Sequence, residues 1–368
     1  MMNSDQDVAR LTVRLAAAQE NYSMCGELAG SAAVAGVVKA DAYGLGMPAI
    51  ARALLDNGCD TFFVARLSEG IALRRLARNA RIYLLDGVQR ETAPALIAHD
   101  LTPVLNSLGQ IEAWSISARA RSKTLAAAIH IDTGMNRLGL PASEMAVLSG
   151  DAATLLKAID VTLVMSHLAC ADDPGAAMNR LQLERFRVAL ASLPPAPASL
   201  ASSGGIMLGK DYVFDMVRPG IALYGGNPQP EKPNPFKPVA VLTGRILQLR
   251  RVDKGESVGY AATFQAGRPS TLATVALGYA DGLMRAIGNR GVGAIAGVRV
   301  PVVGRVSMDL VTLDVTDAPE SSLAAGAEIE FLGDEISLED FAIRAQTASY
   351  EVLTSLGARI PRRYLEVP

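Results

Sequence analysis

Eight short apolar segments recur through the first two-thirds of the chain, and this repeat constrains the fold more than any other feature. Each segment is rich in Val, Ile, Leu, Phe or Ala and ends at a polar residue, and helix-like stretches such as residues 48–57, 67–77 and 178–193 lie between them. Runs of this length and composition indicate strands that are buried on both faces. The segments are residues 33–38, 61–65, 81–85, 101–105, 125–131, 161–166, 198–202 and 212–217.

Strands that alternate with helices form parallel sheets, because each crossover helix returns the chain to the same edge. Eight such units favour a closed (β/α)8 barrel over an open doubly wound sheet. A dinucleotide-binding sheet would carry GxGxxG after its first strand, but the sequence GLGMPA at residues 44–49 lacks the third glycine. We therefore predict an α/β fold that begins with a TIM barrel.

A proline-rich segment near residue 228 divides the chain. Its sequence, NPQPEKPNPFKP, is typical of a linker. Beyond it, short strands separated by Pro and Gly turns predict a mostly-β domain, followed by one helix over residues 338–356. We place the barrel at residues 1–234 and the C-terminal β domain at 235–368. The predicted strands are residues 239–251, 257–263, 270–277, 293–295, 299–303, 310–315 and 328–332.

Composition excludes several classes of protein. The formal net charge of −2 leaves no basic surface for nucleic acid. No apolar run approaches the roughly 18 residues of a membrane span, and the first residues do not resemble a secretory signal. The cysteines, Cys25, Cys59 and Cys170, show no CxxC pairing, which suits a reducing cytoplasm. We expect a soluble, cytoplasmic enzyme with a small-molecule ligand.

Lys39 is the most informative of the polar residues that follow the predicted strands, where barrel enzymes carry their chemistry. Desolvation at such a position would lower the pKa of its amine and favour Schiff-base chemistry. The alternative is a lysine whose stem packs along the strand while its ammonium reaches water. His167 lies near Cys170, but one His and one Cys are too few for a zinc site, so we predict no metal.

Two glycine-containing loops follow the seventh and eighth strands. They read SSGG at residues 202–205 and RPGI at residues 218–221. Small residues let backbone amides approach an anion, and these two loops are the recurrent phosphate site of TIM barrels. The alternative for SSGG is a plain flexible turn. Together with Lys39, the loops favour a phosphorylated aldehyde cofactor.

Eight motifs, taken in order, resemble those of the alanine racemase family. VVKADAYGLG at residues 37–46 resembles the family's pyridoxal-phosphate lysine motif, and the resemblance extends over both domains. Each motif alone is moderately specific, whereas eight in this order are highly specific. The others are HIDTGMNRLG (130–139), SHLACAD (166–172), VRPGIALYG (217–225), GYAATF (259–264), LGYADG (277–282), GRVSMD (304–309) and YEVLTSLGARIPRRY (350–364).

The resemblance implies an amino-acid racemase (an isomerase) that interconverts L-alanine and D-alanine and supplies D-alanine for peptidoglycan. It implies a homodimer in which the partner's β domain completes each site around pyridoxal 5'-phosphate. Lys39 would form the Schiff base with the cofactor and act as one base. Tyr260 of the partner subunit would be the second base, on the opposite face of the cofactor, as inversion requires.

The family's remaining site residues are carried over by their motif positions. Arg218 would face the pyridine nitrogen, and His167 would link Arg218 towards Tyr260. Without the resemblance, Tyr279 and Tyr350 read as ordinary core tyrosines, and Asp309 as a turn residue. The cofactor-binding set is Lys39, Tyr43, His167, Ser203, Arg218, Gly220, Ile221 and Tyr350, and the substrate-binding set is Arg137, Met308, Asp309 and Tyr279.

One position departs from the family pattern. Many members carry a lysine, often carbamylated, two residues before the Asp of the DTG loop, where this chain has His130. A neutral imidazole, a water or an anion such as chloride could orient Arg137 instead. Three other activities stay open as alternatives: a broader Ala/Ser racemase, a fold-related decarboxylase, and a small cofactor-binding barrel. Tyr260 speaks against the decarboxylase, and the β domain speaks against the small barrel.

Overall fold

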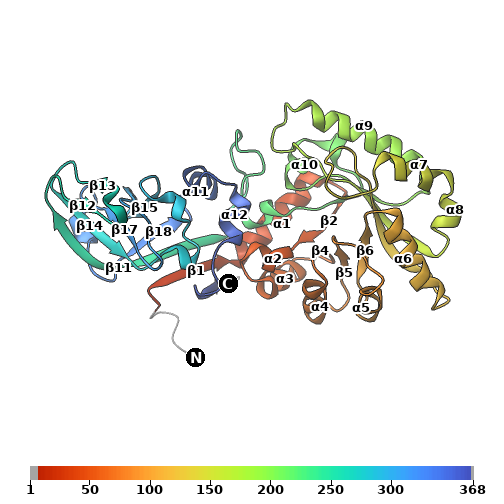
Figure 1. The fold of residues 1–368 in the computed structure, drawn as a ribbon, viewed down its shortest axis with the longest axis horizontal. Helices are drawn as coiled ribbons and strands as arrows, with labels where there is room; N and C mark the ends of the chain where they lie inside the picture. Colours follow the sequence, from red (N-terminus) through yellow and green to blue (C-terminus); the bar gives the residue numbers. More distant parts are fainter. Residues whose placement is uncertain (1–6, 366–368) are drawn as a thin grey trace.

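The computed structural model describes residues 7–365, which form two lobes joined end to end (Figure 1). One lobe is a ring of parallel strands surrounded by helices, and the other is built mainly of antiparallel strands. The long strand β11 (Ala240–Val252) runs from the junction into the β lobe. No helix among the described residues has the length and apolar character needed to cross a bilayer.

The parallel strands close into an eight-stranded barrel. Strands β3 (Gly36–Val37) to β9 (Ala198–Ser199) pair in chain order, and β10 (Met216–Val217) pairs with β2 (Ala33–Val34). The amide of Arg218 donates to Ala201 O at 2.9 Å, which joins the end of β9 to β10. Each predicted barrel segment holds a strand, and the TIM barrel is confirmed. The intervening strands are β4 (Thr61–Val64), β5 (Arg81–Leu84), β6 (Thr102–Leu105), β7 (Leu125–His130) and β8 (Ile159–Met165).

The outer layer forms because each helix buries one apolar stripe against the strands. In α3 (Met47–Asp56), Ile50, Ala51 and Leu54 are buried at the i, i+1, i+4 spacing of a helix face. Every residue of β4 is buried, as expected for a parallel strand covered on both faces. The other barrel-lobe helices are α1 (Leu15–Ala29), α4 (Leu67–Leu76), α5 (Ala93–Ala98), α6 (Leu108–Arg119), α7 (Ala142–Gly150), α8 (Ala152–Leu155), α9 (Ala177–Ala191) and α10 (Ser203–Met207).

The β lobe is organised around β11, which pairs with three antiparallel neighbours. Its main sheet has the order β16-β15-β18-β11-β1-β19, and β14 and β17 extend it from β11. The predicted mostly-β domain is therefore confirmed. The strands are β12 (Ser257–Val258), β13 (Phe264–Gln265), β14 (Ser270–Val275), β15 (Val292–Ile295), β16 (Val298–Pro301), β17 (Val311–Asp314) and β18 (Glu328–Leu332).

The first strand of the chain lies in the β lobe, although its residues precede the barrel. Strand β1 (Ala9–Arg14) pairs antiparallel with β11 and parallel with β19 (Arg362–Leu365). The sequence of a six-residue strand does not indicate which strands, more than 200 residues away, it pairs with. The predicted barrel domain, residues 1–234, includes β1, which the structure places in the β lobe. The predicted boundary at residue 234 stays a prediction.

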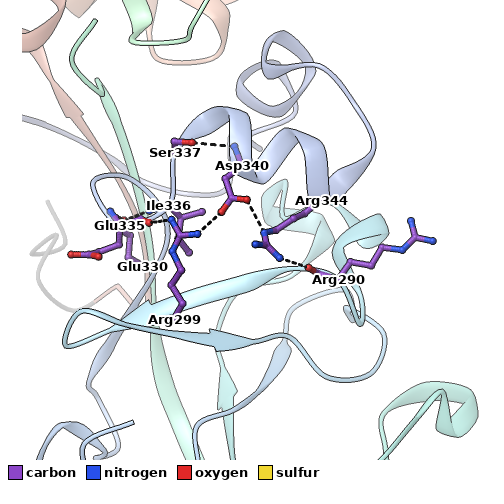
Figure 2. Close-up of polar contacts among 8 residues, drawn as sticks. All are labelled: Arg290, Arg299, Glu330, Glu335, Ile336, Ser337, Asp340 and Arg344. Carbon is purple, nitrogen blue, oxygen red and sulfur yellow. Dashed lines mark hydrogen bonds and ion pairs between the residues drawn. The ribbon is translucent and has the colours of Figure 1, made fainter. Parts of the chain in front are cut away.

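The prediction of a single helix over residues 338–356 is wrong, because the structure has two helices there. α11 (Leu338–Ala345) ends at Gln346, whose φ of 57° is left-handed, and α12 (Ser349–Thr354) follows. Figure 2 shows how α11 is fixed to the β lobe: Asp340 accepts a hydrogen bond from Arg299 at 2.9 Å, and Arg344 donates to Arg290 O at 3.1 Å. The break lets α12 turn towards the barrel, where it lines the cavity described next.

Candidate active site

A cavity of about 780 Å³ opens at the carboxyl ends of the barrel strands. Its walls combine residues that follow β3, β8 and β10 with three residues from α12. The structure thus brings together most of the predicted site, from segments more than 300 residues apart. The predicted residues that line the cavity are Lys39, Tyr43, Arg137, His167, Ser203, Arg218, Gly220, Ile221 and Tyr350.

A left-handed turn follows Lys39. Ala40 to Tyr43 have φ values between 52° and 55°, a conformation that costs L-residues about 1–2 kcal/mol each. Two carboxylates hold the turn: Glu69 accepts from Ala40 N at 2.7 Å, and Asp41 accepts from Met47 N at 2.7 Å. The turn, labelled α2 (Lys39–Tyr43) in Figure 1, places both Lys39 and Tyr43 in the cavity wall. The turn contains no glycine, so its sequence does not predict a left-handed conformation.

The surroundings of Lys39 favour its neutral amine. Burial lowers the pKa of Lys39, and the nearby Arg137 charge lowers it further, whereas Glu69 and Asp86 act in the opposite direction. A lysine in such a position supplies a nucleophilic amine at a lower pH than one in water. Lys39 therefore has the chemistry expected of a residue that attacks an aldehyde.

Arg218 is a cation at the floor of the cavity, with only 4% of its surface exposed. Its guanidinium donates to Ser166 O at 2.7 Å and to Ser199 Oγ, and lies 5.8 Å from the centre of the Phe63 ring. Burial lowers the pKa of Arg218 to about 10, so the group stays charged at neutral pH. Because a guanidinium only donates, any ligand atom that faces it must accept.

The two cavity histidines are uncharged. Burial, followed by the charge of Arg218, lowers the pKa of His167 to about 3 and that of His130 to about 4. A buried side chain from α9, Gln182, supports the first of them by donating to His167 O at 2.9 Å. Gln182 also donates to Thr133 Oγ1 at 3.1 Å. Gln182 could not be found from the sequence, because nothing local marks a helix glutamine as buried.

Hydroxyl and amide groups converge at the other end of the cavity. Ser203 Oγ accepts from Gly220 N at 2.9 Å and from Ala222 N at 3.2 Å, so its own proton must be donated elsewhere. A Cβ on Gly220 would lie 2.4 Å from Tyr43 Oη, so only glycine lets that hydroxyl come so close. Donors of this kind in a cavity with Lys39, Arg137 and Arg218 fit a phosphorylated ligand.

Four predicted site residues do not line this cavity. Tyr260, Tyr279, Met308 and Asp309 all belong to the β lobe, and the first three are 68%, 42% and 54% exposed. Asp309 accepts from Arg359 at 2.7 Å, and the same guanidinium binds Asp281 at 2.7 Å. Exposed aromatic and methionine side chains are enriched on surfaces that contact another protein.

Comparison with known proteins gives matches over nearly the whole chain. The family model "Alanine racemase, N-terminal domain" matches residues 13–228, and "Alanine racemase, C-terminal domain" matches residues 239–364. A Rhodospirillum rubrum protein named "Alanine racemase" is 48% identical over 99% of this chain and 98% of its own length. A protein of Agrobacterium fabrum named "Alanine racemase, catabolic" is 47% identical over 97% of this chain and 92% of its own length.

Solved structures agree with the family models. An alanine racemase from Bartonella henselae "with covalently bound pyridoxal phosphate" superposes with a TM-score of 0.94 at 38% identity, over 98% of this chain and 100% of that one. A biosynthetic alanine racemase from Pseudomonas aeruginosa gives a TM-score of 0.91 at 33% identity, with the same coverage of 98% and 100%. Both domains and their order are shared.

Proposed function

This chain belongs to the alanine racemase family, and from that premise we propose that it interconverts L-alanine and D-alanine with pyridoxal 5'-phosphate. The observation that carries the proposal is the cavity that Lys39, with its lowered pKa, lines together with hydroxyl and amide donors and Arg218. The names of the relatives favour alanine as the substrate over a broader set that includes serine.

The residues of the cavity fit the cofactor. Lys39 Nζ would hold its carbonyl carbon, and Arg218 would face the ring nitrogen and keep it unprotonated. The uncharged His167 would link Arg218 towards Tyr260 of the partner subunit. When bound, pyridoxal phosphate withdraws electrons from the α-carbon of an amino acid joined to it and so acidifies the α-proton. The phosphate would be held by Tyr43, Ser203, Gly220, Ile221 and Tyr350.

Inversion at the α-carbon needs proton transfer on two faces. We assign Lys39 Nζ to one face and Tyr260 Oη of the partner subunit to the other, so that one base removes the α-proton and the other returns it. Arg137 would hold the substrate carboxylate. The partner's Met308 amide would hold it too, and the partner's Tyr279 and Asp309 would narrow the entrance.

We propose a homodimer, and the exposed position of these groups supports it. Tyr260, Tyr279 and Met308 are exposed on the β lobe and do not line the cavity of their own chain. In a two-fold dimer every contact between the chains occurs twice. The β lobe of each chain would therefore complete the active site of the other chain.

Mixing two inactive variants tests the shared site. Lys39→Ala and Tyr260→Phe chains, unfolded and refolded together, should recover about a quarter of wild-type activity. Half of the dimers are then mixed, and each mixed dimer keeps one intact site. Each variant refolded alone is the control, and mixtures that stay as inactive as these controls would exclude a site built from both chains.

The substrate is tested by incubating purified protein with L-alanine, L-serine and L-leucine and resolving the enantiomers by chiral chromatography. We expect D-alanine as the main product, with exchange of the α-proton for solvent deuterium. No turnover of alanine, or no cofactor absorbance, would reject the function.

We further propose that the protein acts in the cytoplasm and supplies D-alanine for peptidoglycan. The free cysteines Cys25, Cys59 and Cys170 suit a reducing compartment. The A. fabrum relative is named catabolic, so the role needs a genetic test. Deletion of the gene should make growth depend on added D-alanine, and unchanged growth without it would favour a catabolic role.

A further inference from the structure

The side-chain amide of Gln182, on α9, has one fixed orientation. The residue is 0% exposed, and its Oε1 accepts from Ala169 N at 2.8 Å. Because a backbone N–H only donates, the oxygen of the amide must be the atom that faces Ala169. The two protons on Nε2 therefore point the other way, to His167 O at 2.9 Å and to Thr133 Oγ1 at 3.1 Å.

These three hydrogen bonds join two loops of the cavity. His167 and Ala169 belong to the loop that follows β8, and Gln182 binds the carbonyl of the first and the amide of the second. Thr133 belongs to the loop that follows β7, four residues before Arg137. One buried side chain on α9 therefore contacts both the loop of His167 and the loop of Arg137.

The loop of Arg137 is fixed where it meets α9. Arg185, one turn after Gln182, donates to Thr133 O at 3.0 Å, so both polar atoms of Thr133 are bound by this helix. A Cβ on Gly134 would lie 3.0 Å from Arg185 Nη1, so the loop and the helix are in close contact. Asp132 Oδ1 accepts from the amides of residues 134, 135 and 136, at 2.9, 2.9 and 3.1 Å. The loop is thus ordered up to the residue before Arg137.

The loop of His167 also contacts the glycine-containing loop at the phosphate end of the cavity. A Cβ on Gly204 would lie 3.0 Å from Ala171 O, so only glycine permits this approach. Ser203, beside that glycine, lines the cavity with His167. A shift of the loop after β8 would therefore disturb the hydroxyl group assigned to the cofactor phosphate.

We propose that Gln182 is a positioning residue, whose amide holds the loop of Arg137 and the loop of His167 in one mutual arrangement. Arg137 and His167 line the cavity, whereas Gln182 is not among the described residues that do, so it acts through the loops. A displacement of about 1 Å at the reacting atoms lowers a rate by as much as roughly 100-fold. This inference rests on the proposed function, in which Arg137 holds the substrate carboxylate and His167 supports Arg218.

Gln182→Glu removes the donated bonds and keeps the shape of the side chain. An ionised carboxylate still accepts from Ala169 N, but it has no proton for His167 O. Burial raises the pKa of such a carboxyl, and its neutral form regains one O–H donor. Relative to the wild type at the same pH, we expect kcat/KM for L-alanine to be about tenfold lower at pH 9 and to recover towards pH 6. The neighbouring groups Asp132, His167 and Arg185 are unchanged, so this comparison removes their own titration.

The matched control is Gln19→Glu. Gln19 also donates to a backbone carbonyl, Ala53 O at 2.9 Å, but it lies on α1, away from the residues that line the cavity. Its kcat/KM should equal the wild-type value at every pH. All rates are divided by the bound cofactor, measured from its visible absorbance. Wild-type kcat/KM in Gln182→Glu at every pH would overturn the inference, because a role in packing alone predicts that result.

Thr133→Val and Thr133→Ser test the link between the loops even where Gln182→Glu does not fold. Valine has the shape of threonine but no hydroxyl, so one Nε2 proton of Gln182 loses its acceptor. We expect KM for L-alanine to rise about threefold to tenfold in Thr133→Val, with a smaller change in kcat, and to return in Thr133→Ser. Equal KM values in both variants would overturn the inference. Absence of turnover by the wild type, measured alongside, would instead reject the proposed function.

Discussion

Replacing Arg362 with methionine tests whether the C-terminal tail holds the left-handed turn that follows Lys39. Arg362 donates to Gly44 O, at the end of that turn, from Nε at 3.3 Å and from Nη2 at 2.9 Å. Methionine keeps the apolar stem and removes every one of these N–H groups. The other acceptors of Arg362 are the carbonyls of Leu356 (3.1 Å), Gly357 (2.7 Å) and Ile360 (2.8 Å).

The expected loss of stability follows from these contacts. A hydrogen bond from a charged donor contributes about 1.5–3 kcal/mol, and water can replace part of it at a half-buried site. We therefore expect the free energy of unfolding to fall by about 3 kcal/mol when all five hydrogen bonds of Arg362 are lost, with most of the loss from the two bonds to Gly44 O. An unfolding entropy of about 2.1 cal/mol/K per residue gives about 0.8 kcal/mol/K for 368 residues, so Tm should fall by about 4 °C.

A second effect should appear in cofactor binding. The four left-handed residues from Ala40 to Tyr43 store about 4–8 kcal/mol of backbone strain, and the turn relaxes more easily once Gly44 is released. Lys39 and Tyr43 then lose their shared orientation. Circular dichroism on heating gives Tm, and the visible absorbance left after dialysis gives the retained cofactor.

Arg359→Met is the matched control. Arg359 lies in the same tail but binds Asp281 and Asp309, away from the turn. This variant should lose less stability than Arg362→Met and should retain its cofactor. If Arg362→Met unfolds at the wild-type temperature and keeps its cofactor equally well, the turn does not depend on Arg362 and the prediction is wrong.

Three further predictions concern the site. Tyr260→Phe should keep the cofactor absorbance and lose racemisation, measured by polarimetry. Gly220→Ala should weaken cofactor binding about tenfold or more in a fluorescence titration, because the new Cβ would lie 2.4 Å from Tyr43 Oη. The pKa values of about 4 and 3 for His130 and His167 lie below the unfolded value, so the unfolded state binds more protons below about pH 6.5. Stability in urea should thus fall as the pH drops from 6.5 towards 4, by up to about 1.4 kcal/mol per pH unit per histidine.

Each of these predictions has a control. Wild-type racemisation by Tyr260→Phe would reject its role as a base. Gly150→Ala should bind cofactor normally, since no atom lies within 4 Å of its added Cβ, and equal loss in both glycine variants would contradict the argument. His130→Gln should lower the dependence of stability on pH. Equal slopes in the wild-type protein and this variant would count against the buried, neutral ring.

The barrel could be predicted because each of its strands leaves a pattern in consecutive residues. Strands buried on both faces appear as short apolar runs, and Lys39, His167 and Arg218 stand at their ends by position alone. The end of α11 could not be predicted, because Gln346 adopts a left-handed conformation without the glycine that usually signals one. Only the family resemblance, and not residue physics, pointed to Tyr260.

The features missed were those that depend on distant parts of the chain. The turn after Lys39 consists of Ala, Asp, Ala and Tyr, with no glycine to favour positive φ, and contacts from Glu69 and Arg362 stabilise it. The tautomer of His130 likewise depends on Asn106, on the neighbouring strand. Neither the left-handed turn nor the His130 tautomer can be inferred from a pattern of consecutive residues.

The position of β1 has a consequence for how the chain folds during synthesis. Leu11 pairs with Leu242 and with Arg362, so this strand emerges from the ribosome long before either neighbour exists. At roughly 5–20 residues per second, β11 follows after about 10–50 s and β19 later still. In that interval the barrel can fold, while β1 remains an unpaired edge open to wrong partners. The earliest strand made is therefore among the last to find its place, and a chaperone that shields it should raise the yield of folded enzyme.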